Sequence, residues 1–585
     1  MKKFLTLFFS MLVLIALLTA CGDSGKEKPT DDDTSDVGPG TDVDASKGSQ
    51  GLRYDINEKE GVATLTGMGT CEDSRIIVPA KTADGYDVIA LGDDVFRDVT
   101  YITSIQLPST IEEIGERAFS GCTSLKSINL QDLDYLLTIP SEAFMSCVSL
   151  EEIEFPSGVG AILDRAFARC SSLQSVELPS GLSSIGMQAF MYCGRLSEIT
   201  LPTDNYALID LANANMAFGY CTSLKEFTFT DMVSVIPENL FVGCTGLRKV
   251  TLSESIESIG RAAFAGCTRL QTVNLPLASG MDEIAAMTFA NCSALQGITI
   301  PSTVTTIGQG AFSGCASFTN IVLPNSVTTM HDSAFENCTS LREVQLSASL
   351  KSIPDMAFLG CENLLAIDIP NSVSSIGVMA FFNCFKLESA IFNDSVTTVK
   401  ESAFANCINL TYLKTGKVLS NIGKNAFKSC TSLPFIVFET SCTIGHNAFS
   451  SCTSLKFILA DPVENSEKYA IGENAFDRCT SLEFFLYNSQ NEAALANLIG
   501  DLEAYNDNLA LTWCIIGNEN TTSGALTDEN GFLYKTLNVN GTEYRYRFFK
   551  RDENFNIIFA TETTVGEHIS PDLYKPSADS DSGNN

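Results

Sequence analysis

The sequence predicts a repeat solenoid, a fold in which short coils of chain stack one upon the next. A phenylalanine recurs seventeen times between residues 96 and 476, and eleven of the sixteen intervals between copies are 23 residues. Alanine precedes it in fourteen copies, and a cysteine follows three residues later in sixteen. An alternating run of leucine, isoleucine and leucine comes next. A repeat this short cannot bury its apolar face alone, so neighbouring copies must stack.

Each position of the repeat has a physical role. Residues 326–346 are one copy, and its recurrent apolar positions are Val327, Met330, Ala334, Phe335, Cys338, Leu341, Val344 and Leu346. The Leu-x-x-Val-x-Leu stretch alternates as a strand does and sends its apolar side chains inward. The proline that often follows ends the strand because it has no N–H to donate. We expect Ala-Phe-x-x-Cys to form one short helical turn, and the glycine before it in several copies to permit a turn or a close backbone approach.

With these positions, residues 89–487 resemble the BspA-type leucine-rich repeat of bacterial surface proteins. The resemblance implies a curved solenoid with a parallel β-sheet on its concave face. Seventeen coils at a strand spacing of about 4.8 Å would extend roughly 80 Å. The resemblance also implies attachment to host extracellular-matrix proteins or to other bacteria.

The first fifty residues are expected to lie outside the solenoid. Lys2 and Lys3 precede an apolar stretch that ends at Leu17 and has the length of a secretory signal. Residues 18–22, Leu-Thr-Ala-Cys-Gly, resemble a bacterial lipobox, which implies a signal peptide over residues 1–20 and a lipid anchor on Cys21. The alternative is an ordinary signal peptide with a chance cysteine. Residues 21–50 are acidic and rich in Ser, Thr, Gly and Pro, which predicts a disordered tether.

A solenoid needs a cap at each end of its core. Residues 51–88 contain short apolar runs, such as 62–66 and 75–79, and predict a small β-rich N-terminal cap. Residues 488–575 combine helical spacing over 491–505 with three strand-like runs, over 532–537, 542–550 and 555–561. This predicts an α+β C-terminal cap. Residues 576–585 are expected to be disordered.

The composition argues against several kinds of chemistry. The chain has 37 Lys and Arg against 70 Asp and Glu, a formal charge of −33, so nucleic acid is not an expected partner. His331, His446 and His568 lie in no catalytic motif, and the repeat has no Cys-x-x-Cys pair for zinc. We therefore expect no enzyme activity, no cofactor and no metal site. Sixteen of the twenty cysteines share one repeat position; we expect small buried apolar side chains there, with a disulfide framework as the alternative.

The strand position two residues after the repeat leucine indicates a binding surface. It is polar or charged in the early copies and aromatic in the last ones, at Tyr412, Phe435, Phe457 and Phe484. An exposed apolar stripe of this kind marks an interface. Burial of the stripe beneath the C-terminal region explains the same residues equally well.

Insertions and one basic stretch are further candidates. Four copies carry extra residues after the strand, at 132–137, 204–213, 277–282 and 461–469, and three of these carry Tyr135, Tyr206 and Tyr469. Insertions at one repeat position project from one side of a solenoid, and tyrosine suits recognition; loops without function are the alternative. Residues 544–551, Tyr-Arg-Tyr-Arg-Phe-Phe-Lys-Arg, suit an edge strand protected by charge or a surface for anionic groups.

Together these features predict a non-enzymatic surface protein that binds a protein or glycan ligand and is held at the membrane through Cys21. An adhesin for extracellular-matrix or other cell-surface proteins is the first hypothesis. A glycan-capture lipoprotein and a structural envelope protein without a soluble ligand are the alternatives.

Overall fold

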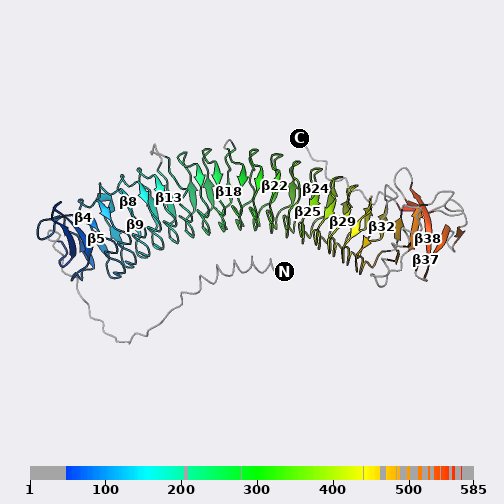
Figure 1. Ribbon diagram of the computed structural model, residues 1–585, viewed down its shortest axis with the longest axis horizontal. Coiled ribbons are helices and arrows are strands. Elements are labelled where there is room, and N and C mark those ends of the chain that lie inside the picture. Colours follow the sequence, from blue (N-terminus) through cyan, green and yellow to red (C-terminus); the bar gives the residue numbers. More distant parts are fainter. Residues whose placement is uncertain are drawn as a thin grey trace, which may run out of the picture. The chain divides into compact units, whose positions relative to one another are not determined.

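The computed structural model describes 48–202, 208–277, 280–438, 440–460, 470–482, 484–487, 496, 499–500, 512–516, 525–527, 533–539, 542–551, 557–559 and 568–569. The proposed signal peptide, most of the tether, and Cys21 lie outside these residues. Coils of chain stack in single file from β4 (Asp87–Leu91) to β34 (Phe484–Tyr487) (Figure 1). The parallel-stranded solenoid predicted from the sequence is confirmed.

Most coils contribute to two ladders of parallel strands, each divided into several shorter sheets in which a strand pairs with the equivalent strand of a neighbouring coil. The first ladder contains the strands that follow the repeat leucine. They are β5 (Ser104–Gln106), β7 (Ser127–Ile128), β9 (Glu152–Ile153), β11 (Ser175–Glu177), β13 (Glu198–Thr200), β14 (Glu226–Thr228), β16 (Lys249–Thr251), β18 (Thr272–Val273), β21 (Asn320–Val322), β23 (Glu343–Gln345), β24 (Ala366–Ile369), β26 (Ser389–Phe392), β28 (Tyr412–Lys414), β30 (Phe435–Phe438), β32 (Phe457–Ala460) and β34.

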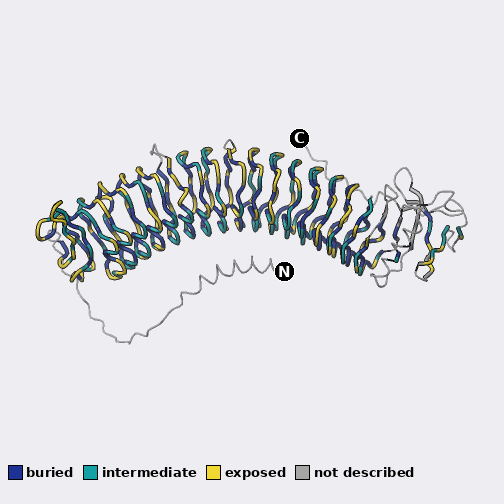
Figure 2. Tube along the Cα trace, viewed as in Figure 1, coloured by how far each residue is buried: buried dark blue, intermediate teal, exposed yellow. Residues whose placement is uncertain are grey.

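The second ladder contains two-residue strands that precede the repeat glycine. They are β6 (Glu113–Ile114), β8 (Thr138–Ile139), β10 (Ala161–Ile162), β12 (Ser184–Ile185), β15 (Val235–Ile236), β17 (Ser258–Ile259), β19 (Glu283–Ile284), β20 (Thr306–Ile307), β22 (Thr329–Met330), β25 (Ser375–Ile376), β27 (Thr398–Val399), β29 (Asn421–Ile422), β31 (Thr443–Ile444) and β33 (Ala470–Ile471). In both ladders the apolar residue points inward and its neighbour outward, as in the exposed–buried–exposed strands β11 and β13 (Figure 2).

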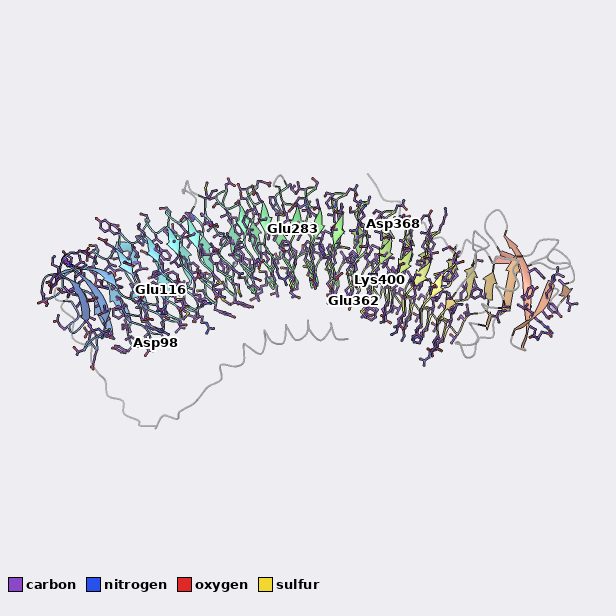
Figure 3. All side chains as sticks on the ribbon, viewed as in Figure 1. Asp98, Glu116, Glu283, Glu362, Asp368 and Lys400 are labelled. Carbon is purple, nitrogen blue, oxygen red and sulfur yellow. The ribbon has the colours of Figure 1, made fainter. Side chains whose placement is uncertain are left out.

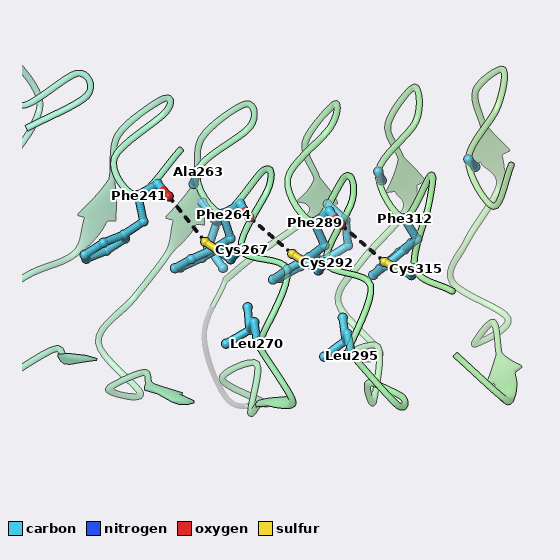
Figure 4. Close-up of a cluster of buried hydrophobic side chains, with 14 of the residues drawn as sticks. Phe241, Ala263, Phe264, Cys267, Leu270, Phe289, Cys292, Leu295, Phe312 and Cys315 are labelled. Atoms are coloured by element: carbon cyan, nitrogen blue, oxygen red, sulfur yellow. Dashed lines mark hydrogen bonds between the residues drawn. The ribbon is translucent and has the colours of Figure 1, made fainter. Parts of the chain in front are cut away.

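The core between the ladders is a continuous stack of phenylalanine rings. All seventeen repeat phenylalanines are 0 % exposed. The rings of neighbouring coils are stacked, with centroids 4.8–5.8 Å apart. Each such pair adds about 0.5–1.5 kcal/mol beyond the burial of its area. Figure 4 shows four consecutive members of the stack, Phe241, Phe264, Phe289 and Phe312.

The Ala-Phe-x-x-Cys segment is a run of tight turns, so the expected helical turn was wrong. The N–H of Cys338 donates to the carbonyl of Phe335 three residues earlier, whereas the N–H of Phe335 donates to Ala357 in the next coil, at 2.9 Å. A helix would use that N–H within its own turn. Ser333, directly before the segment, and Asn337 within it also have φ of 59° and 57°, outside the helical region.

The repeat glycines are required by the close approach of neighbouring coils. A Cβ built on Gly423 would lie 2.7 Å from the amide N of Glu401 and from the carbonyl C of Lys400. Gly260 and Gly445 meet the backbone of the preceding coil at 2.6 Å in the same way. Their φ values are not in the left-handed region, so the constraint is space between coils and not backbone conformation.

The N-terminal cap closes both ladders. β1 (Arg53–Asn57) and β2 (Val62–Gly67) form an antiparallel hairpin, and β2 then pairs parallel with β4 at the start of the second ladder. β3 (Arg75–Ile77) pairs parallel with β5 and begins the first ladder. The outer edge of β3 is covered by Ser49, whose N–H donates to the carbonyl of Ile77 at 2.7 Å. The end of the sheet is therefore protected from pairing with another chain.

The C-terminal strands continue the first ladder. β35 (Thr512–Ile516) pairs parallel with β34, and β38 (Thr542–Arg551) pairs parallel with β35. β37 (Leu533–Val539) joins β38 antiparallel and then pairs with β36 (Leu526–Thr527), while β39 (Ile557–Phe559) pairs with β38 and β40 (His568–Ile569). Of the segment with helical spacing, Ala496, Ile499 and Gly500 are described, and they are helical.

We expect Gly423→Ala to lower the free energy of unfolding by about 1–3 kcal/mol, because the added methyl group must displace the backbone of the preceding coil. Gly297→Ala is the matched control, since a Cβ at Gly297 meets nothing within 4 Å. The control is expected to change stability by less than about 0.5 kcal/mol. Urea unfolding followed by circular dichroism measures both, and equal midpoints for the two variants would contradict the close-approach account.

Candidate binding surfaces

The outward side of the first ladder is exposed, and its side chains lie in register wherever neighbouring strands pair. Glu198 lies opposite Ser175 in the next strand, and Glu226 lies opposite Lys249. The exposed residues of this column in the early coils are Ser127, Glu152, Ser175, Glu198, Glu226, Lys249 and Thr272. Glu154 and Glu177, two residues further along their coils, are also exposed. Repulsion between glutamates on neighbouring strands destabilises the stacking of the coils, and burial of the core must offset this free-energy cost.

A polar groove of about 480 Å³ crosses the first strands of this ladder, β3, β5, β7 and β9. Arg75 lies at one end and Glu152 and Glu154 at the other. Gln131 of the 3-10 helix η1 (Leu130–Asp132) contributes to the lining. Sequence reasoning missed this groove because its side chains are ordinary outward strand residues. Only the stacking of four strands brings them together.

A second groove, of about 650 Å³, runs along the second ladder in the middle coils. Small residues at the repeat glycine position, Gly260, Ala285 and Gly308, line it together with His331, which occupies the same position in the next coil. Val235 is 40 % exposed at the other end. The other polar lining residues include Glu238, Ser258, Arg261, Glu283, Thr306 and Gln309. The replacement of glycine by histidine was visible in the sequence, but the groove was not.

The aromatic stripe of the last coils is mostly covered. Phe435 and Phe457 are 8 % and 7 % exposed, and their rings stack with centroids 5.4 Å apart. They therefore do not form the exposed patch that the adhesin hypothesis uses. Tyr412 is half-buried. Phe484 pairs in register with Phe457 along the ladder, but its side chain lies outside the described residues.

Of the three insertion tyrosines, the structure describes Tyr135. Tyr135 is 67 % exposed and Leu137 is 64 % exposed, so the first insertion does present a tyrosine to solvent. Tyr206 and Tyr469 lie outside the described residues, as does Cys21. The site proposed for these three residues stays a prediction.

The basic strand β38 lies inside the C-terminal sheet, so its assignment as an edge strand was wrong. It pairs with β35 and with β37. Tyr546 and Phe548 are 2 % exposed, whereas Arg545 is exposed and its guanidinium lies 5.0 Å from the ring centroid of Tyr534. The alternating aromatic and cationic residues therefore give β38 one buried face and one solvated face.

The repeat cysteines form a column of buried thiols, each bonded to the preceding coil. Every one of the sixteen lies with its Sγ 3.0–3.4 Å from the carbonyl oxygen of the preceding coil's phenylalanine, to which it donates (Figure 4). Eighteen cysteines of the described part of the chain are free thiols. Burial raises the pKa of Cys193 to about 12, so the thiol stays protonated and unreactive at neutral pH. The repeat cysteine is therefore a hydrogen-bond donor as well as a small core residue.

The described residues contain no group of three or more His, Cys, Asp or Glu arranged to hold a metal ion. Within the same part of the chain, no helix is both long and apolar enough to cross a membrane. The described residues present long rows of exposed side chains along the strands of the solenoid.

Stacked parallel coils, a buried phenylalanine–cysteine column and outward strand faces define a leucine-rich-repeat solenoid. The chain belongs to the family of BspA-type leucine-rich-repeat regions, which matches residues 89–215, 212–342, 282–411 and 351–483.

Two solved structures are similar to this chain. A leucine-rich repeat protein from Bacteroides ovatus is 26 % identical, with a TM-score of 0.47, and the match covers 79 % of this chain and 98 % of that one. A leucine-rich cell surface protein from Faecalibacterium prausnitzii is 29 % identical, with a TM-score of 0.39, over 62 % of this chain and 93 % of that one. No curated protein matches the chain.

The buried thiols predict a loss of stability at alkaline pH. Burial raises the pKa of Cys193, Cys244 and Cys315 to about 12, whereas a thiol in an unfolded chain has a pKa of about 8.5. The unfolded state therefore loses the proton first. This contribution is fully present below about pH 8.5 and falls by about 1.4 kcal/mol per thiol and pH unit as the pH rises toward 12.

Urea unfolding between pH 8 and 11 measures that slope, with the triple variant Cys193→Ala, Cys244→Ala, Cys315→Ala as comparison. Each replaced thiol is expected to make the slope shallower by about 1.4 kcal/mol per pH unit. An unchanged slope would show that these thiols ionise equally in both states.

Proposed function

We propose that this protein is a non-enzymatic, adhesin-like binding protein of the cell surface, which presents the outward side of the first ladder to extracellular-matrix or other cell-surface proteins. The observation that carries the proposal is the recurrence of exposed side chains along that side. An exposed side chain occupies the same strand position in successive coils, from Ser127 on β7 to Thr272 on β18, and lies in register wherever neighbouring strands pair.

The size and rigidity of this surface suit a protein partner. A stable protein interface buries about 800 Å² on each partner. Thirteen residues on and beside four strands line the N-terminal groove alone, and the acidic residues from Glu152 to Glu226 continue from it along the ladder. Because the strands pair with one or both neighbouring strands and pack on the ring stack beneath, binding requires little further ordering of them.

The polarity of the surface favours a partner with a basic patch. Five glutamates are exposed on or directly beside the successive strands β9, β11, β13 and β14, and Lys249 follows them on β16. The glutamates are Glu152, Glu154, Glu177, Glu198 and Glu226. Complementary charge speeds encounter and sets the orientation of binding. The lipid anchor proposed on Cys21 and the tether over residues 21–50 would hold this surface away from the membrane.

We expect the full chain, purified in detergent, to bind at least one matrix or cell-surface protein saturably in a solid-phase assay. Glu198→Lys is expected to weaken that binding roughly tenfold or more, because it reverses a charge in the middle of the acidic surface. Glu283→Lys, on the second ladder, is the matched control and is expected to leave affinity unchanged. Binding that responds to both variants alike would place the contact elsewhere. A folded chain that binds none of the proteins tested overturns the proposal and favours a structural role.

A further inference from the structure

Two residues in every coil have a left-handed backbone, and one of them, the second residue after the repeat phenylalanine, lies directly before the repeat cysteine in sixteen coils. The φ of this residue lies between 57° and 76° in all seventeen coils. Nine of the seventeen residues are glycine or asparagine, the types that adopt this conformation most readily. Figure 3 labels the first member of the column, Asp98. The column is one continuous line of turns along the solenoid.

Three consecutive coils depart from this preference with bulky residues, Arg169, Tyr192 and Tyr220, whose φ values are 65°, 63° and 59°. A left-handed backbone is unfavourable for a large side chain. The other left-handed position of the coil also holds bulky residues, such as Arg165 and Met216, so the site is argued from the contacts of these three side chains and not from the backbone. Asparagine at the same position in other coils shows that the fold does not require these side chains. We call Arg169, Tyr192, Tyr220 and the next two residues of the column, Gly243 and Gly266, the tyrosine ledge.

The side chains of the tyrosine ledge are stacked along the solenoid. The rings of Tyr192 and Tyr220 are nearly parallel, 15° apart, with centroids 4.8 Å apart. The guanidinium of Arg169 lies 5.7 Å from the centroid of the Tyr192 ring. The stack holds each side chain in one conformation before any ligand binds, which reduces the entropy cost of recognition.

Beyond Tyr220 the column continues with two glycines, which carry no side chain. A Cβ on Gly243 would lie 2.5 Å from Cδ1 of Tyr220, so the ring packs directly on the backbone of that coil. Gly266 follows at the same position. Both tyrosines and both glycines are partly exposed. Burial raises the pKa of Tyr220, so its phenol stays protonated and available as a donor.

Arg169 is exposed and forms no salt bridge within the described part of the chain, although the protein carries a charge of −33. By contrast, Arg165 of the same coil pairs with Glu142, and Arg478, at the equivalent position of the last coil, pairs with Asp477. A guanidinium presents several N–H donors in a fork that fits a carboxylate or a sulfate. An unpaired arginine at one end of an aromatic stack therefore suits an anionic group on a ligand.

We propose that the tyrosine ledge binds an oligosaccharide bearing an acidic group, with the sugar units along the exposed ring edges and hydroxyls of Tyr192 and Tyr220 and the acidic group at Arg169. From Arg169 to Gly243 the ledge spans three coil spacings, roughly 14 Å, which fits several sugar units and not one. So narrow a ledge is too small for a stable protein interface of about 800 Å². This inference rests on the proposed surface-binding function but uses a different site and a different ligand class.

The test is a glycan array probed with the full chain in detergent, with sulfated and uronic-acid oligosaccharides beside their neutral counterparts. The double variant Tyr192→Asn, Tyr220→Asn is expected to lose acidic-glycan binding at least tenfold. Its thermal midpoint should not fall, because asparagine is the ordinary residue of the column. Arg169→Asn is expected to weaken binding of the acidic oligosaccharides roughly tenfold and to leave the neutral ones unchanged. Arg478→Asn, in the same column at the far end, is the matched control and is expected to bind as the unaltered chain does.

Three outcomes would overturn this inference. Acidic-glycan binding that survives in the folded double variant would place the site elsewhere, and binding of neutral and acidic glycans alike would remove the role of Arg169. Absence of any glycan binding would reject the ledge as a glycan site. Matrix-protein binding that depends on Glu198 and not on Tyr220 would in that case leave the proposed function intact. Loss of matrix-protein binding in the double variant would instead assign the ledge to a protein partner.

Discussion

No coil of this protein can complete its own core, and that constraint governs the rest of the structure. The ring of each repeat phenylalanine is covered by the rings of the coils before and after it, at 4.8–5.8 Å. The thiol of each repeat cysteine donates to the phenylalanine carbonyl of the preceding coil, as Cys338 does to Phe312 at 3.2 Å. Because both contacts cross from coil to coil, they set the spacing and the register of the whole array.

The regular spacing of coils in the core also aligns equivalent residues at the surface. When coils repeat with the same spacing, equivalent outward residues line up in columns, and a surface built in this way varies only through the side chains placed in each column. The first ladder is acidic around Glu198, and its late aromatic pair, Phe435 and Phe457, is covered. The turn column is mostly glycine and asparagine but holds Arg169, Tyr192 and Tyr220 side by side. Departures from the repeat are therefore where binding is most reasonably sought.

Close stacking also explains where sequence reasoning was wrong. The turn around Phe335 was expected to be helical because its apolar residues lie three apart, but its N–H groups bond to the next coil instead. The basic strand β38 was assigned to an edge by its charge, yet it pairs on both sides because the first ladder continues through β34 and β35 into the C-terminal sheet. In both cases a partner distant in sequence decided the outcome, and local pattern cannot reveal such a partner.

The period, the strand positions, the buried phenylalanine and cysteine, and the need for small residues between coils follow from the sequence by itself, since each is a local pattern that recurs from coil to coil. The glycines and asparagines before the repeat cysteine were an available signal for left-handed turns that sequence reasoning did not use. Only the tertiary structure decided that Phe435 and Phe457 are covered, that Gly260, Ala285 and Gly308 line a groove, and that Arg169, Tyr192 and Tyr220 stack. The physical reason is that exposure and contact depend on residues of neighbouring coils, more than twenty positions away along the chain.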